Sequence, residues 1–173
     1  VALRFQQQVN GVPVFGGQAS VQVDRDGSVL SSLADLSPRA AEAPSQARVL
    51  PAVARVTAIE AVARDTGAPA GALEATIPEA QVYDPLVVGA DDTFGVRLTW
   101  LVEVTGPTPP VRHLVLVDAT TGAIALSFSQ LTHALDRQIC DFANVANADE
   151  TCISPVRIEG GPDFRLHAHD RAT

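Results

Sequence analysis

Histidines are the first candidates for chemistry in this 173-residue chain, which has four of them. His113, His133, His167 and His169 begin no H-E-x-x-H motif, the helical spacing at which two imidazoles and a glutamate form a zinc peptidase site. His167 and His169 would share one face of a strand, but an isolated pair in a polar segment is more often solvated than metal-bound. No G-x-S-x-G elbow supports a serine nucleophile. We therefore expect no catalytic residue and no metal ligand here.

The two cysteines are Cys140 and Cys152. Residues 139–142 and 153–158 have the pattern of two strands, and a Cys140–Cys152 bridge would close a hairpin between them. On the chain-entropy model such a bridge stabilises a fold by roughly 3 kcal/mol, and it would place the protein in an oxidising compartment. Two free thiols in a cytosolic protein are the alternative. A metal pair is disfavoured because neither cysteine belongs to a C-x-x-C motif.

Aspartates occur at several predicted turns. They are Asp24, Asp26, Asp84, Asp91, Asp92 and Asp118. Aspartate side chains commonly accept hydrogen bonds from nearby backbone amides in turns, so this capping role is expected. Calcium binding is the alternative, but no D-x-D-x-D-G loop is complete. Trp100 belongs to the inward-facing set of a predicted strand, which indicates a core residue rather than a ligand platform.

Composition limits the possible partners. Twenty acidic and 12 basic residues give a net charge of -8, so nucleic acid and anionic membrane surfaces are poor partners. No run of 18 apolar residues could span a membrane. The sequence opens at Val1 inside a strand pattern, without methionine or a leader. We therefore expect a piece of a longer precursor.

The N-terminal part of the chain has the pattern of a small antiparallel β unit. Asn10-Gly11 separates two alternating runs and predicts a hairpin with a type I′ turn. Pro13 lacks an amide N–H, which predicts that its strand lies at a sheet edge. Gly16-Gly17 is expected to turn the chain into the next strand, and Asp26-Gly27 to form a second turn. The unit should bury one face and leave Gln and Ser on the other.

A helix and a second set of strands follow. Thr57 and Glu60 form a capping box that predicts a helix start, and Gly67 is expected to end the helix. Strands are expected over residues 79–88, 96–104, 113–117 and 124–128, the second of them showing clear alternation. One helix followed by antiparallel strands predicts an α+β fold, with the helix packed across a curled sheet.

Two stretches carry a family resemblance. RFQQQVNGVPVFGGQASVQVDRDGSV resembles the FTP module, the fungalysin/thermolysin propeptide motif. Residues 51–130 resemble a cystatin-like PepSY module in VYDPLV, LTWLVEV and LVDATTGAI. In this order, the pair is similar to the prosegment of secreted thermolysin-like (M4) zinc metallopeptidases. The resemblance implies an FTP-type β module over 1–37, a linker over 38–50, a PepSY-type lobe over 51–130, and a processing segment with the start of the catalytic domain over 131–173.

The resemblance also implies a function. Such a propeptide acts as an intramolecular chaperone and active-site inhibitor until proteolysis removes it, and its partner is the cognate catalytic domain. Zinc, and calcium, would belong to that secreted parent peptidase. Leu131, Thr132 and His133 would occupy its cleft, with His133 next to the zinc and cleavage before Ala134. An ordinary surface linker is the alternative for this segment. For the whole chain, the alternatives are a stand-alone PepSY-type inhibitor acting in trans and a non-catalytic secreted β module.

Overall fold

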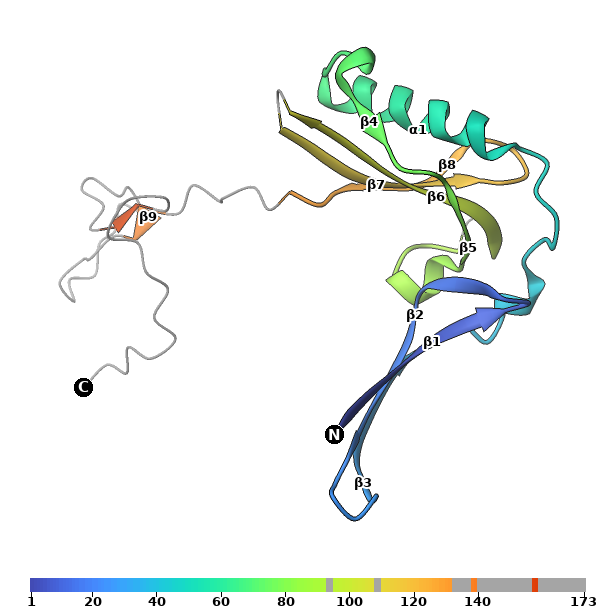
Figure 1. Ribbon diagram of the computed structural model, residues 1–173, viewed down its shortest axis with the longest axis vertical. Helices are drawn as coiled ribbons and strands as arrows, with labels where there is room; N and C mark the ends of the chain where they lie inside the picture. The colour runs from blue at the N-terminus through green and yellow to red at the C-terminus, as the bar shows by residue number, and fades with distance from the viewer. Residues whose placement is uncertain (93–94, 108–109, 132–137, 140–156, 159–173) are drawn as a thin grey trace, which may run out of the picture. The chain divides into compact units, whose positions relative to one another are not determined.

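The fold is an α+β arrangement of one α-helix and a largely antiparallel sheet, as the sequence predicts (Figure 1). The computed structural model describes residues 1–92, 95–107, 110–131, 138–139 and 157–158. The chain divides into two units, Val1–Leu131 and Thr132–Thr173. The first unit contains the helix and an eight-stranded sheet, and the site is built from this unit.

The sheet has the strand order β1-β2-β5-β6-β7-β8, with β3 paired to β2 and β4 paired to β6. Its strands are β1 (Ala2–Val9), β2 (Val12–Val23), β3 (Val29–Asp35), β4 (Glu74–Ala75), β5 (Glu79–Tyr83), β6 (Arg97–Pro107), β7 (Pro110–Asp118) and β8 (Ile124–Ser129). The helix α1 spans Pro51–Thr66, and short 3-10 turns occur at η1 (Ala40–Glu42), η2 (Ala70–Ala72) and η3 (Pro85–Val88). The β2–β5 contact is parallel and the other pairings are antiparallel.

The predicted N-terminal hairpin is confirmed. Asn10 and Gly11 connect β1 to β2 with φ angles of 51° and 81°, the left-handed values that a type I′ turn requires at both positions. The second predicted turn is also present, since the amide of Ser28 donates to Asp26 Oδ1 at 3.1 Å and Gly27 has a φ of 89°. The residues of the two turns therefore determine both hairpins, β1–β2 and β2–β3.

Strand β2 occupies a central position, so the prediction of an edge strand is wrong. It pairs with β1 on one side and with β5 and β3 on the other. Pro13 is tolerated because the contact with β5 consists of one pair, Val14 with Val82, so the ladder on that side does not depend on an amide at Pro13. Figure 1 shows β2 connecting the helix-covered part of the sheet to the projecting β1–β3 part.

Gly16-Gly17 lies inside β2, so the prediction that it leads into a new strand is also wrong. The β1–β2 register shifts at this point, which marks a bulge that bends the strand. A Cβ on Gly17 would lie 2.8 Å from the Cβ of Val14. The bend therefore depends on close backbone approach that only glycine allows.

Helix α1 begins earlier than its capping box predicts. It starts at Pro51, where the fixed φ of proline suits the first helical position, and Leu50 provides no side-chain cap. Thr57 lies mid-helix, and its Oγ1 donates to the carbonyl of Val53 at 3.1 Å, so the capping-box prediction is wrong. The predicted end is confirmed, because Gly67 has a φ of 73° and donates its amide to Ala63 at 2.9 Å.

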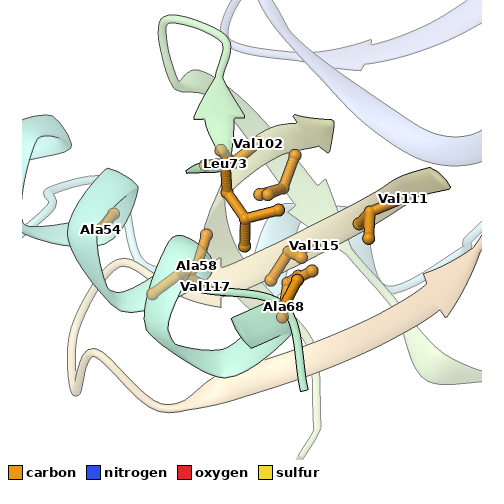
Figure 2. Packing of buried hydrophobic residues seen from close by; sticks show 10 residues of the cluster. Ala54, Ala58, Ala68, Leu73, Val102, Val111, Val115 and Val117 are labelled. Atoms are coloured by element: carbon orange, nitrogen blue, oxygen red, sulfur yellow. The ribbon is translucent and has the colours of Figure 1, made fainter. Parts of the chain in front are cut away.

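The main core lies between α1 and one face of β6 and β7 (Figure 2). Small residues on the helix allow close approach to a layer of valines. The central members are Ala54, Ala58, Val62, Val102, Val104, Val115 and Val117, and none of them is exposed. Trp100 packs against this cluster as predicted, and its Nε1 donates to the carbonyl of Val49 at 2.8 Å. This core gives the first unit a stable interior of its own.

In the second unit, β9 (Gln138–Ile139) pairs antiparallel with β10 (Arg157–Ile158). The pairing agrees with the predicted hairpin, over fewer residues. Cys140 and Cys152 lie outside the described residues, so the predicted bridge stays a prediction. In the described part of the chain, no helix is long and apolar enough to cross a membrane.

Candidate interaction site

The predicted cleft-binding segment follows the last strand of the sheet. Among the strands that the structure describes, β8 pairs with β7 alone and so forms an edge. After it, the amide of Gln130 donates to the carbonyl of Arg112 at 2.7 Å, and the amide of Leu131 donates to Ser129 Oγ at 3.2 Å. Leu131 is half-buried. Thr132, His133 and Ala134 lie outside the described residues, so their predicted role stays a prediction.

The face of the sheet opposite α1 is covered only in part, because Leu116 on this face is fully buried whereas its neighbours are less covered. Strand alternation places Leu101, Leu114, Leu126 and Phe128 on this face, where neighbouring pairs join Leu114 to Phe128. Leu101, Leu114 and Leu126 are half-buried, and Phe128 keeps 41% of its surface exposed. This apolar face next to the β8 edge is suited to contact with another protein surface.

His113 is the one histidine that the structure describes, and it lies on the face of β7 that α1 covers. It is buried, and its Nδ1 has no hydrogen-bond partner in the described part of the molecule. Among the described residues, no group of three or more His, Cys, Asp or Glu side chains is placed to hold a metal ion. The described residues therefore form surfaces for binding, and they place no set of metal ligands around His113.

The first three strands form a three-stranded extension, here called the ribbon, which consists of β1, β3 and residues 18–23 of β2. Its alternate side chains divide into an apolar and a polar face. The apolar face carries Leu3, Phe5, Ala19, Val21, Val23, Val29, Ser32 and Ala34. Leu3, Phe5 and Val29 keep 43%, 55% and 65% of their surface exposed. The expectation that this unit buries one face is wrong here, because no other described element covers the ribbon (Figure 1).

A buried polar network anchors the base of the ribbon. The side-chain amide of Gln7 donates to the carbonyl of Ser37 at 2.8 Å, and the amide of Ser37 donates back to Gln7 Oε1 at 2.9 Å. Ser37 Oγ then donates to Asp84 Oδ2 at 2.6 Å. Arg39 binds Asp84 Oδ1 at 2.9 Å and Asp92 Oδ2 at 2.7 Å. The network thus joins β1, the segment after β3 and the turn after β5.

The charges of this network stabilise one another. Burial alone would raise the pKa of Asp84, but hydrogen bonds from Ser37, Arg39 and the Leu86 amide, with the charge of Arg39, lower it below its ordinary value. The hydrogen bond from Arg39 likewise lowers the pKa of Asp92, and both carboxylates raise the pKa of Arg39. The three groups are therefore charged at neutral pH, and each carboxylate is paired.

Sequence reasoning found only part of this network. The predicted capping role of Asp84 is confirmed, since its Oδ1 accepts from the Leu86 amide at 3.2 Å. The partners Ser37 and Arg39 were missed, because they lie 47 and 45 residues away along the chain. The nearest sequence signal is the Asp84-Pro85 dipeptide, which marks a turn and says nothing about a distant arginine.

Comparison with known proteins agrees with this geometry. Residues 1–32 match the Fungalysin/Thermolysin Propeptide Motif, and this range covers β1, β2 and the first part of β3. The chain is also similar to bacillolysin from Brevibacillus brevis, with 29% identity over 133 residues, which is 75% of this chain and 24% of that protein. The chain thus spans about a quarter of the length of this curated relative.

A propeptide motif, joined to an α+β unit with exposed apolar side chains, points to a prosegment as the class of protein. The motif and the similarity to bacillolysin support an N-terminal prosegment of a thermolysin-like (M4) metallopeptidase.

Proposed function

We propose that this prosegment acts as an intramolecular chaperone and active-site inhibitor of a secreted metallopeptidase until proteolysis removes it. The observation that carries the proposal is the propeptide motif at residues 1–32, on a unit whose last strand leads directly into the predicted inhibitory segment. The partner is the cognate zinc peptidase domain of the same precursor. Zinc and calcium belong to that domain, and this chain contributes no catalytic residue.

The proposed organisation follows from the two modules. Residues 1–37 form the FTP-type module, 38–50 a linker, and 51–130 a cystatin-like PepSY lobe, with residues 131–173 containing the processing site and the start of the catalytic domain. The packing of α1 on β6 and β7 supports the PepSY assignment, since it places one helix across a largely antiparallel sheet. In the last part, a Cys140–Cys152 bridge would strengthen the β9–β10 pair and suits a secreted protein.

Inhibition is proposed to occur by occupation of the cleft. Residues 131–134 continue from the edge strand β8, and an extended segment can pair its backbone with a strand of the peptidase and thereby block substrate. His133 would lie next to the zinc, and cleavage before Ala134 would leave a product-like inhibitor. Tethering keeps the effective concentration near roughly millimolar, so a modest contact area suffices before cleavage.

The chaperone role uses the same binding surfaces. Secreted proteases often depend on kinetic stability, with a high barrier between folded and unfolded states. A unit that folds by itself and binds a native-like form of the peptidase domain lowers the barrier to folding. The core between α1 and the sheet makes the first unit suitable for this task, because it needs no contribution from the peptidase.

The experiment compares two chain ends that differ by two residues. Chains ending at His133 and at Leu131 are tested for inhibition of the mature peptidase from the same reading frame, and for recovery of activity when that peptidase is refolded. The chain ending at His133 should inhibit strongly. The chain ending at Leu131 should still assist refolding but inhibit about tenfold or more weakly, a loss of about 1.4 kcal/mol.

Equal inhibition by both chains would refute cleft occupation by His133. Failure of both chains to bind the peptidase or to raise the refolding yield would refute the propeptide role itself. Circular dichroism of both chains serves as the control, because the cut at Leu131 coincides with the end of the first compact unit.

A further inference from the structure

The ribbon differs in its two faces although both are exposed. On the apolar face, Leu3 pairs with Val21 and Phe5 pairs with Ala19. On the polar face, Arg4 lies beside Ser20. Soluble proteins rarely leave a contiguous apolar strip uncovered unless it contacts another molecule. The alternation in this ribbon therefore indicates a surface suited to one-sided contact.

The apolar face carries no charged side chain. Its members are aliphatic or aromatic apart from Ser32, whereas the charges of the ribbon, Arg4 and Asp35, alternate onto the other face. Burial of a charge without a partner is costly, so the occupant of this face must itself be apolar and uncharged at the contact. This excludes an electrostatic partner for the face.

The base of the ribbon is fixed before any partner binds. Gln7 joins β1 to Ser37 by two hydrogen bonds of 2.8 and 2.9 Å, and Ser37 is held by the buried carboxylate of Asp84. A surface that is already ordered loses less conformational entropy on association. The ribbon is therefore preorganised as an arm, even though its apolar face covers nothing within the described residues.

Two observations identify the occupant. The propeptide motif spans residues 1–32 and so coincides with the strands that carry the apolar face, rather than with the core beneath α1. The relative that the chain matches is about four times longer than the matched part, since the alignment covers 24% of it. A motif named for peptidase propeptides, placed on an unpartnered face, points to the peptidase part of such a precursor as the molecule that covers it.

We infer that the apolar face of the ribbon, centred on Leu3, Phe5 and Val29, is a docking surface for an uncharged apolar patch on the peptidase domain of the same precursor. This inference rests on the proposed function and adds a second contact, separate from the inhibitory segment at residues 131–134. It assigns the motif a binding role in place of a purely structural one.

The test titrates the full 173-residue chain with the mature peptidase from the same reading frame. The double variant Leu3→Ser/Phe5→Ser removes the centre of the face, and Leu33→Ser is the matched control because it is 71% exposed and lies on the opposite face beside Ser20. The double variant should weaken the dissociation constant about tenfold or more, as expected for central interface residues. The control should stay within about twofold of wild type.

The outcomes separate this inference from the proposed function. Wild-type affinity in the double variant, with an unchanged thermal unfolding midpoint, overturns the docking face and leaves the prosegment role standing. A wild-type chain that does not bind the peptidase overturns both. Sedimentation of the wild type and of the double variant provides the remaining check. If the wild type is a dimer, and the double variant is a monomer that keeps its affinity for the peptidase, the face binds a second copy of the chain. That result overturns the inference.

Discussion

Replacement of Arg39 by leucine tests whether the polar network holds the base of the ribbon. The variant removes the guanidinium that binds Asp84 Oδ1 at 2.9 Å and Asp92 Oδ2 at 2.7 Å, while keeping much of the side-chain bulk. The side chain of Asp84 is 1% exposed and that of Arg39 is 28% exposed. Loss of Arg39 therefore leaves a buried carboxylate with its charge uncompensated.

The expected cost follows from what Asp84 retains. Breaking a buried ion pair from one side costs about 3–5 kcal/mol. In the variant, Asp84 still accepts hydrogen bonds from Ser37 Oγ at 2.6 Å and from the Leu86 amide at 3.2 Å. We therefore expect the free energy of unfolding to fall by about 3 kcal/mol at pH 7, near the lower end of that range. Urea unfolding followed by Trp100 fluorescence measures this change, since the chain has one tryptophan.

The pH dependence has a definite sign. In the wild type, the pKa of Asp84 lies below its ordinary value of 3.8, so its contribution to stability is present above that pH and is lost as the pH falls through the folded pKa. Without Arg39, burial favours the neutral acid, and the variant recovers stability by protonating Asp84. Arg39 also lowers the pKa of Asp92. In the variant, the pKa of Asp92 should therefore rise, as that of Asp84 does. The difference between variant and wild type should therefore narrow from pH 7 to pH 4.

The matched control is Arg112→Leu, which breaks the ion pair with Glu103. The side chain of Arg112 is 56% exposed and that of Glu103 is 32% exposed. Neither group is buried like Asp84, so this pair should contribute no more than about 1 kcal/mol. Equal destabilisation by the two variants would refute the argument. A difference between the Arg39 variant and wild type that stays constant between pH 7 and pH 4 would also refute it, because the Asp84 carboxylate would then not be the group that Arg39 compensates.

Two further substitutions test the core and the bend of β2. Leu116→Ala should lower the free energy of unfolding by about 2–5 kcal/mol, because Leu116 is fully buried. The control Leu33→Ala, at an exposed position, should change the free energy of unfolding by less than about 0.5 kcal/mol. Similar losses at both positions would contradict the assigned burial. Gly17→Ala should cost about 1–3 kcal/mol, because its Cβ would lie 2.8 Å from the Cβ of Val14. In the control Gly11→Ala, the new Cβ meets no atom within 4 Å, so only the φ of 81° destabilises the variant, by about 1 kcal/mol. A larger loss of stability at Gly11 than at Gly17 would contradict the bulge argument.

Features that depend on neighbouring residues could be predicted from the sequence. The turn at Asn10-Gly11 and the helix end at Gly67 follow from backbone preferences that require no distant partner. The helix start could not be located in the same way. The capping box at Thr57 satisfies a local rule, but packing of Ala54 against the sheet and the proline at position 51 extend the helix by more than a turn before it. Tertiary contacts override a local signal in this case.

The position of β2 and the polar network depend on contacts between distant segments. The pair Val14–Val82 places β2 beside β5, and Asp84 contacts Arg39 from 45 residues away. Neither contact has a local pattern in the sequence. For the candidate site, the sequence resemblance indicates residues 131–134, but their proposed role would depend on a surface of another domain. The local physics of this chain alone could not specify that role.

The prediction that the N-terminal strands bury one face is wrong at the ribbon, although the alternation rule behind it holds elsewhere in the chain. Alternation predicts a buried face wherever a second layer exists, and β6 and β7 obey this rule because α1 provides that layer. The ribbon has the same alternation, with Phe5 and Val29 exposed and no described layer above them. In the proposed function, the prosegment folds before the peptidase domain, binds it and then leaves. That role would require a core that is complete by itself and a separate apolar surface that is not part of that core. Local rules fail most often where a sequence serves a partner, and here the failure falls within the strands that match the propeptide motif.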